Sequence, residues 1–105
     1  MKDERKWQPS DRMIEILNKE SVTPDEVKDV LVECFSHAHG DPEQAMFILK
    51  KQATTVGMYW EEPNKQGIEK MIPKLALIAQ DFRNPEVISM NKAKIISLLN
   101  KCVDC

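Results

Sequence analysis

The chain has 105 residues, of which 42% are hydrophobic and 30% are charged, as in a folded domain with a single core. Its 15 Lys and Arg residues are mixed along the chain with 17 Asp and Glu residues, and the net charge is -2. Because no long run of like charge occurs, the composition argues against a disordered tail and against a polybasic patch for nucleic acid or a membrane surface.

The N-terminal residues 1–9 carry charged side chains where a signal peptide would need an apolar segment. The longest apolar run, residues 75–79, is too short to span a membrane. Three cysteines in a chain without an export signal favour reduced thiols. We therefore expect a soluble, cytoplasmic protein with one helical domain over residues 1–105, in which residues 1–9 form a partly ordered N-terminal arm.

Helix-start signals that contain proline recur along the chain. Thr23 with Glu26, and Asp41 with Gln44, have the spacing of a capping box, and a proline occupies the first helical position after each cap. Asn84 precedes a proline in the same way. Since glycine is scarce and β-branched residues form no alternating runs, the pattern predicts an all-α fold of about five helices.

The first helix is predicted over about residues 11–20, with its apolar residues on one face. The second follows Thr23 and carries apolar residues at the 3.6-residue period of an amphipathic helix. This apolar stripe consists of Val27, Val30, Leu31, Cys34, Phe35 and Ala38. Gly40 supplies a left-handed residue that ends the helix, and Asp41 begins the third helix at once. We therefore expect a tight corner between the second and third helices.

The third helix is predicted to end near Gly57. The apolar stripe of the fourth extends over residues 68–82 and stays in phase across Pro73, which favours one proline-kinked helix over two short ones. The fifth is predicted to begin at Asn84, with a break or a kink at Asn91. Together these elements predict a compact all-α bundle.

The cysteines and histidines form the clearest candidate for a chemical site. Cys34 with His37, and Cys102 with Cys105, are each three residues apart, so each pair faces one side of a helix and could chelate zinc. The second pair also has the spacing of a thiol–disulfide redox motif. However, Cys34 and Cys102 fall within apolar stripes, which is typical of thiols that pack in a core. A helix C-terminus also raises the pKa of a thiol rather than lowering it. We favour packing, with no cofactor, and keep a zinc or redox site as the alternative.

A DNA-binding interpretation rests on the outline of a helix-turn-helix formed by the second helix, the glycine turn and the third helix. The third helix would then present its polar side chains to the major groove, namely Gln44, Lys50, Lys51 and Gln52. Its first turn carries Asp41 and Glu43, whose carboxylates repel phosphate. Nucleic acid is therefore the third choice of partner.

Several large apolar side chains remain after the inward faces are assigned. Phe47 and Leu77 lie opposite the stripes of the third and fourth helices, and Ile96 widens the apolar face of the fifth. Tyr59 and Trp60 are adjacent in the loop before the fourth helix. Exposed apolar patches and aromatic residues are typical of interfaces. We predict that these five residues contact a protein partner, most simply in a homodimer.

No local motif of an enzyme is present. The sequence contains no glycine-rich phosphate loop, no nucleophile elbow and no His-Glu-x-x-His pair. The prediction is thus a non-catalytic, self-associating protein-protein interaction module.

Overall fold

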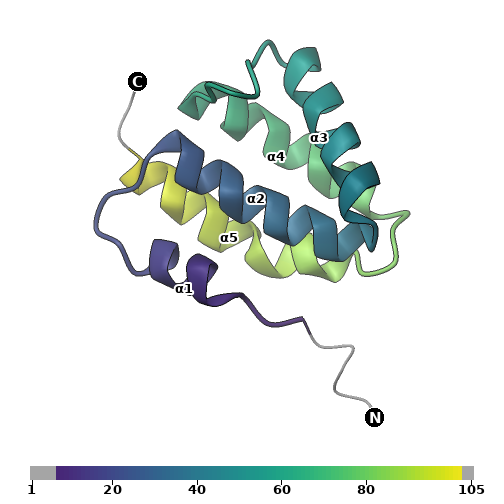
Figure 1. Cartoon of the computed structure of the whole chain (residues 1–105), viewed down its shortest axis with the longest axis horizontal. Helices are drawn as coiled ribbons and strands as arrows, with labels where there is room; N and C mark the ends of the chain where they lie inside the picture. Colours follow the sequence, from purple (N-terminus) through teal and green to yellow (C-terminus); the bar gives the residue numbers. More distant parts are fainter. Residues whose placement is uncertain (1–6, 103–105) are drawn as a thin grey trace.

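The computed structural model describes residues 7–102, and the regular structure of this part of the chain is helical. Its helices are α1 (Asp11–Leu17), α2 (Pro24–His39), α3 (Pro42–Thr55), α4 (Lys65–Ala79) and α5 (Glu86–Lys101). They form a compact bundle in which α2 contacts each of the other four helices (Figure 1). The predicted all-α bundle is confirmed.

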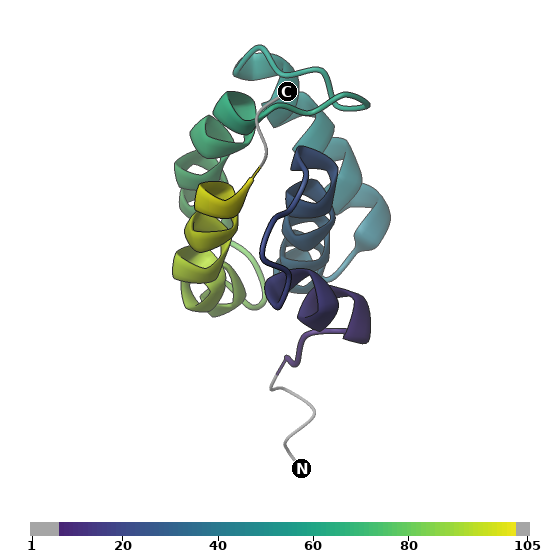
Figure 2. The same cartoon turned by 90° about the vertical axis from the view of Figure 1, so that its left-hand side faces the viewer.

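The helices pack in two layers around a common core. Figure 2 shows α4 and α5 on one side and α2 and α3 on the other, with α1 at the edge beside α2. The whole predicted stripe of α2 is buried between these layers, and Phe35 is completely enclosed. The 3.6-residue period of that stripe therefore explains why α2 occupies the centre.

The predicted start and stop signals act through specific hydrogen bonds. The Thr23 hydroxyl accepts from the Glu26 N–H and the Glu26 carboxylate accepts from the Thr23 N–H, which completes the capping box of α2. Gly40 has φ 92 and ends α2, and the Asp41 carboxylate then accepts two N–H groups from the first turn of α3. Asn64 caps α4 by accepting from Gly67 at 2.7 Å. These caps place the tight α2–α3 corner where it was predicted.

The first helix ends earlier than predicted, at Leu17 rather than near residue 20. The ammonium group of Lys101 donates to the carbonyl oxygens of Leu17 and Lys19, at 3.0 and 2.9 Å. These bonds satisfy carbonyl groups that a longer helix would have used internally. The end of α5 thus supplies the hydrogen-bond donor for the C-terminal end of α1.

Asn84 does not cap α5, which begins at Glu86 without a side-chain cap. Its backbone N–H donates to the Ala38 carbonyl and its side chain donates to the His37 carbonyl, so it satisfies the C-terminus of α2 instead. Asn91 does not break α5 either, because its buried amide donates to the Val87 carbonyl at 2.8 Å. A buried amide that bonds within its own helix is tolerated there.

The fourth helix runs through Pro73 as one element, as predicted, but ends at Ala79 rather than at Phe82. Beyond the helix, the half-buried ring of Phe82 packs edge-on against Phe35 and His39, with centroid distances of 5.2 and 4.5 Å. The ring of Phe82 therefore packs against the core, although Phe82 lies beyond the end of α4.

Gly67 allows the α3–α4 loop to lie directly on α4. A Cβ atom at this position would be 2.7 Å from the Cβ and Cγ atoms of buried Met58. Any larger residue would have to displace the loop, because packed interiors leave no free space for added atoms. The loop that carries Tyr59 and Trp60 is therefore held close to the first turn of α4.

We expect Glu26→Gln to lower stability near neutral pH by on the order of 1 kcal/mol while leaving the cap geometry in place. The hydrogen bond from Lys19 and that from the Thr23 N–H hold the pKa of Glu26 below its usual value, against the opposing effect of burial. Because the folded-state pKa is lowered, this contribution is present above the unfolded-state pKa and is lost as the pH falls through the folded one.

Urea unfolding at a series of pH values measures this effect. The variant should lose less stability than the wild type on acidification, so that the two curves converge at low pH. Glu20→Gln is the matched control, since Glu20 is exposed in the adjoining loop. Parallel curves for Glu26→Gln and the wild type would contradict the prediction.

Candidate interaction surface

A groove opens between α4 and α5, which lie side by side in Figure 2. Its volume is about 240 Å³. Its walls are formed by Glu69, Ile72 and Pro73 of α4 and by Lys92, Ile96, Leu99 and Asn100 of α5. Ile72 and Leu99 are almost fully buried and form the floor, whereas Ile96 stands on the rim with 43% of its surface exposed. The groove is therefore apolar at its base and polar at its edges.

The apolar surface continues from the groove along α4. Leu77 lies one helical turn after Pro73, so the two side chains share a face of the helix. Leu77 is 67% exposed, the highest value among the large hydrophobic residues of the described chain. Leu77 and Ile96 were both predicted to lie outside the core. They thus belong to one apolar surface region that includes the groove.

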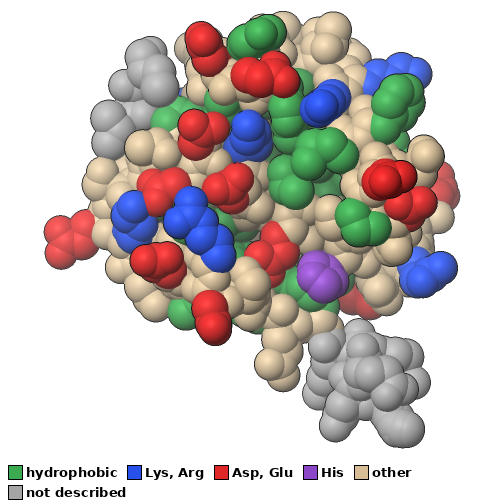
Figure 3. Space-filling model, viewed as in Figure 1, with side chains coloured by type: hydrophobic (Ala, Val, Ile, Leu, Met, Phe, Trp, Pro, Cys, Tyr) green, Lys and Arg blue, Asp and Glu red, His purple; other side chains and the backbone are tan. Residues whose placement is uncertain are grey.

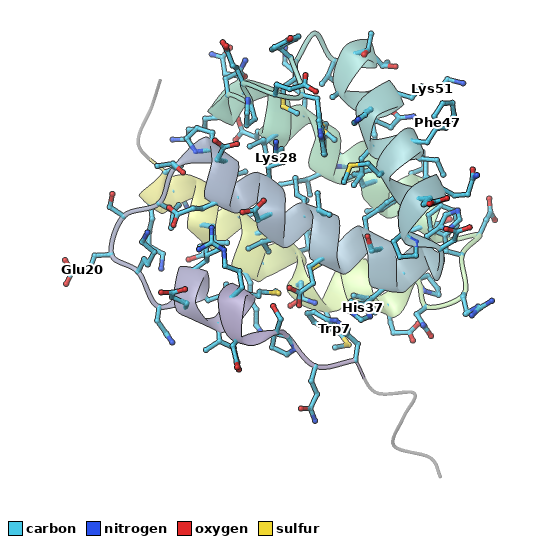
Figure 4. The ribbon with its side chains drawn as sticks, in the orientation of Figure 1. Trp7, Glu20, Lys28, His37, Phe47 and Lys51 are labelled. Atoms are coloured by element: carbon cyan, nitrogen blue, oxygen red, sulfur yellow. The ribbon has the colours of Figure 1, made fainter. Side chains whose placement is uncertain are left out.

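The structure places Phe47 and Tyr59 on a different part of the molecule. Hydrophobic side chains gather between α2 and α3 on the face in Figure 3. On α3, Phe47 projects outward beside Lys51, which follows it by one turn (Figure 4), and it is 64% exposed. Tyr59 is equally exposed in the loop after α3. The outward orientation predicted for Phe47 and Leu77 is confirmed, while their role in binding stays a prediction.

Trp60 differs from the other four predicted contact residues because it is half-buried against the core. The Lys28 ammonium lies 5.0 Å from the centroid of its ring and donates to its carbonyl oxygen at 3.1 Å. This cation–π contact and hydrogen bond attach the α3–α4 loop to α2. Part of the Trp60 ring therefore packs within the protein, and only its exposed part can contact a partner.

Two exposed hydrophobic residues were not identified from the sequence. Ile14 of α1 is 44% exposed, and Met90 of α5 is 57% exposed. On α1, Asp11, Ile14 and Glu15 follow one another at positions i, i+3 and i+4 and so share the outer face. This spacing was the available signal for Ile14, because it puts an isoleucine on the polar side of a short helix.

The thiol of Cys34 is completely buried in the middle of α2. Burial, together with the neighbouring Glu33 carboxylate, raises the pKa of this thiol to about 12. His37 is exposed one turn later, and its ring lies 5.6 Å from that of Trp7 (Figure 4). The two members of this predicted pair therefore have opposite surroundings, one in the core and one at the surface.

The structure does not bring Cys34 and Cys102 together. Cys102 forms a backbone bridge with Val22, directly before α2 begins. Cys34 lies eleven residues beyond Thr23, which corresponds to about 16 Å along the helix. Two sulfur ligands of one zinc ion lie within about 5 Å of each other. Cys105 lies outside the described residues, and within residues 7–102 no group of three or more Cys, His, Asp or Glu side chains is arranged to hold a metal.

The candidate DNA-reading helix α3 has its first N–H groups already occupied. The carboxylate of Asp41 accepts from the N–H groups of Glu43 and Gln44, which are the donors that a phosphate would need. Lys50 and Lys51 are exposed further along the helix, whereas Gln52 is half-buried. A negative charge thus occupies the end of α3 that would meet the DNA backbone.

No protein-family model, no curated protein and no solved structure matches this chain. Within residues 7–102, no helix combines the length and the apolar character needed to cross a bilayer.

Proposed function

We propose that the protein is a non-catalytic interaction module that binds a protein partner, including a second copy of itself. The observation that carries this proposal is the α4–α5 surface, by which we mean Ile72, Pro73, Leu77, Ile96 and Leu99. An apolar groove that continues onto exposed aliphatic side chains is typical of surfaces that contact other proteins.

The size of the groove favours a protein side chain over a separate small ligand. Its volume of about 240 Å³ is below the range of roughly 300–1,000 Å³ that drug-sized ligands occupy. Leu77 extends the apolar surface beyond the groove, where a small molecule would leave it uncovered. A helix or loop of a partner can cover the groove and Leu77 together.

The expected strength of the contact follows from the areas involved. Complete burial of a fully exposed leucine or isoleucine contributes about 1.5–3 kcal/mol, and Leu77 and Ile96 would each contribute less because they are already partly buried. Association costs at least about 4 kcal/mol in lost translation and rotation. These two side chains alone therefore give weak binding, and a stable complex must also use the groove floor and its charged rim.

Sedimentation velocity over a micromolar to millimolar concentration series tests the self-association part of this proposal. We expect the mass of the wild type to rise with concentration. Ile96→Ser and Leu77→Ser should each weaken association about tenfold or more, as loss of an interface anchor does. Met90→Ser is the matched control, since Met90 is exposed on α5 but does not line the groove. A wild type that is strictly monomeric at millimolar concentration would remove self-association from the proposal.

A further inference from the structure

Charge is distributed unevenly over the helices. Residues 7–40, which include α1 and α2, contain seven Asp and Glu residues but only three Lys and Arg residues. Residues 65–101, which include α4 and α5, contain three acidic and seven basic residues. Figure 3 shows Asp and Glu side chains gathered over α1 and α2. The two parts of the molecule therefore carry opposite excess charges of equal size.

The ion pairs within the described chain reinforce this asymmetry. All of them lie in α1, α2 and the segment between these helices: Arg12–Glu15, Arg12–Asp29, Lys19–Glu26 and Lys28–Asp25. Each basic residue in residues 7–40 thus has a carboxylate partner, whereas Asp11, Glu20 and Glu33 form no ion pair there, and Glu33 accepts hydrogen bonds from Ser10. On α4 and α5, Lys70, Lys74 and Lys92 form no ion pair with another described residue, and of these three Lys92 lines the groove. Both excess charges remain open to an external partner.

The outer face of α1 complements the groove. Ile14 is an exposed apolar side chain between two carboxylates, those of Asp11 and Glu15. The contact of Glu15 with Arg12 is long, at 3.9 Å, and both side chains are mostly exposed, so it is easily exchanged for another cation. The groove offers an apolar floor with Lys92 on its α5 wall and Glu69 on its α4 wall, and Lys70 and Lys74 are exposed further round α4, outside the groove.

We propose that α1 of one copy docks into the α4–α5 groove of a second copy. This inference rests on the proposed function and specifies its partner. Ile14 would contact the apolar floor and Ile96, and the carboxylates of Asp11 and Glu15 would face Lys92 on the α5 wall rather than Glu69 on the α4 wall. The contact is heterologous, because two different surfaces meet, and it generates a ring or an open chain rather than a two-fold dimer.

Two observations favour this arrangement over a two-fold contact between α4–α5 surfaces. A two-fold contact would bring together two surfaces on which Lys70, Lys74 and Lys92 outnumber Glu69, and like charges at an interface are unfavourable. In addition, α1 and the α4–α5 side lie on different sides of the bundle in Figure 2. One copy can therefore use both surfaces at the same time.

Two variants test the proposal, and each disrupts one of the two contacting surfaces while leaving the other intact. Ile14→Ser removes the apolar anchor of α1, and Ile96→Asp puts a carboxylate on the groove rim against those of α1. Both positions are more than 40% exposed, so both variants should fold, which circular dichroism and urea unfolding verify. Each variant alone is expected to sediment as a monomer where the wild type associates. An equimolar mixture is expected to form a species of two chains and nothing larger, because one intact contact remains.

The alternatives give different results. A two-fold contact through the α4–α5 surface would leave Ile14→Ser as associated as the wild type, and that result would overturn the head-to-tail arrangement while leaving the proposed function standing. A monomeric mixture under conditions where the wild type associates would overturn it as well. A monomeric wild type would remove the self-association part of both proposals.

Salt provides an independent measurement on the unmodified chain. The screening length is about 10 Å at 0.1 M ionic strength and about 3 Å at 1 M. The head-to-tail contact is therefore expected to weaken about tenfold or more over this range. Association that is unchanged or stronger in high salt would overturn the role assigned to the charged rim.

Discussion

Phe35→Ala is expected to lower the free energy of unfolding by about 3–5 kcal/mol, the range for a large aromatic side chain removed from a core. Phe35 is fully enclosed on α2, and its ring meets that of Phe82 edge-on at 5.2 Å. A domain of this size is stable by only about 5–15 kcal/mol, so the variant should lose a large share of its stability. Urea unfolding followed by circular dichroism gives the change directly.

Phe47→Ala is the matched control, because the chemical change is identical and only the surroundings differ. Phe47 is mostly exposed on the outer side of α3. Its replacement should change stability by less than about 0.5 kcal/mol, as is usual for surface positions. Equal losses for the two variants would mean that Phe47 packs within the fold, and it would then not be available to a partner.

Cys34 is expected to be about a thousandfold less reactive toward a thiol reagent in the folded protein than in the unfolded chain. Only the thiolate attacks, and burial raises the pKa of this thiol to about 12 from an ordinary value of 9.0. Near pH 8 this shift alone reduces the thiolate fraction by about three orders of magnitude. Steric enclosure in α2 slows the reaction further.

The measurement uses a chain with Cys102→Ala and Cys105→Ala, so that Cys34 is the sole thiol, and compares labelling rates with and without denaturant. The same pKa shift makes stability depend on pH. Because the pKa of Cys34 is higher in the folded state, the contribution of its thiol to stability is fully present below about pH 9 and is lost as the pH rises toward 12. Labelling of the native protein at the unfolded rate would contradict the buried position. It would also favour the zinc alternative, which requires a thiolate at Cys34.

The fold was predictable wherever the pattern was local. The stripe of α2, the Thr23 capping box and the Gly40 stop each depend on residues within a few positions of one another. Most of the errors involve partners that are distant in sequence, whereas Asn91 bonds within its own helix, to the Val87 carbonyl. Asn84 has the chemistry of a cap, but it bonds to His37, 47 residues earlier. No periodicity of the sequence can anticipate which distant carbonyl group will lie within reach of such a side chain.

The sequence was sufficient to predict which side chains are exposed on the candidate surface, but not that some of them lie beside a groove. Helical phase was sufficient to direct Phe47 and Leu77 outward. The groove itself depends on the relative position of α4 and α5, which no single helix encodes. Trp60 was harder to place because the lysine that covers it lies 32 residues earlier, on α2. The face around Ile14 was missed although the spacing of Asp11, Ile14 and Glu15 places this isoleucine on the polar side of α1.

The bonds from Lys101 to the carbonyl groups of Leu17 and Lys19 join residues that are 84 and 82 positions apart. A ribosome adds about 5–20 residues per second, so Lys101 follows Lys19 by roughly 4–16 s. Throughout that interval the nascent chain has α1 but not the lysine that holds its last turn. The apolar side chains of Met13 and Ile16 are buried in the finished fold, in which α1 packs on α2, the helix that follows it in the chain. The C-terminal end of α1 is therefore made early, but its last carbonyl groups receive their donor only when α5 is complete.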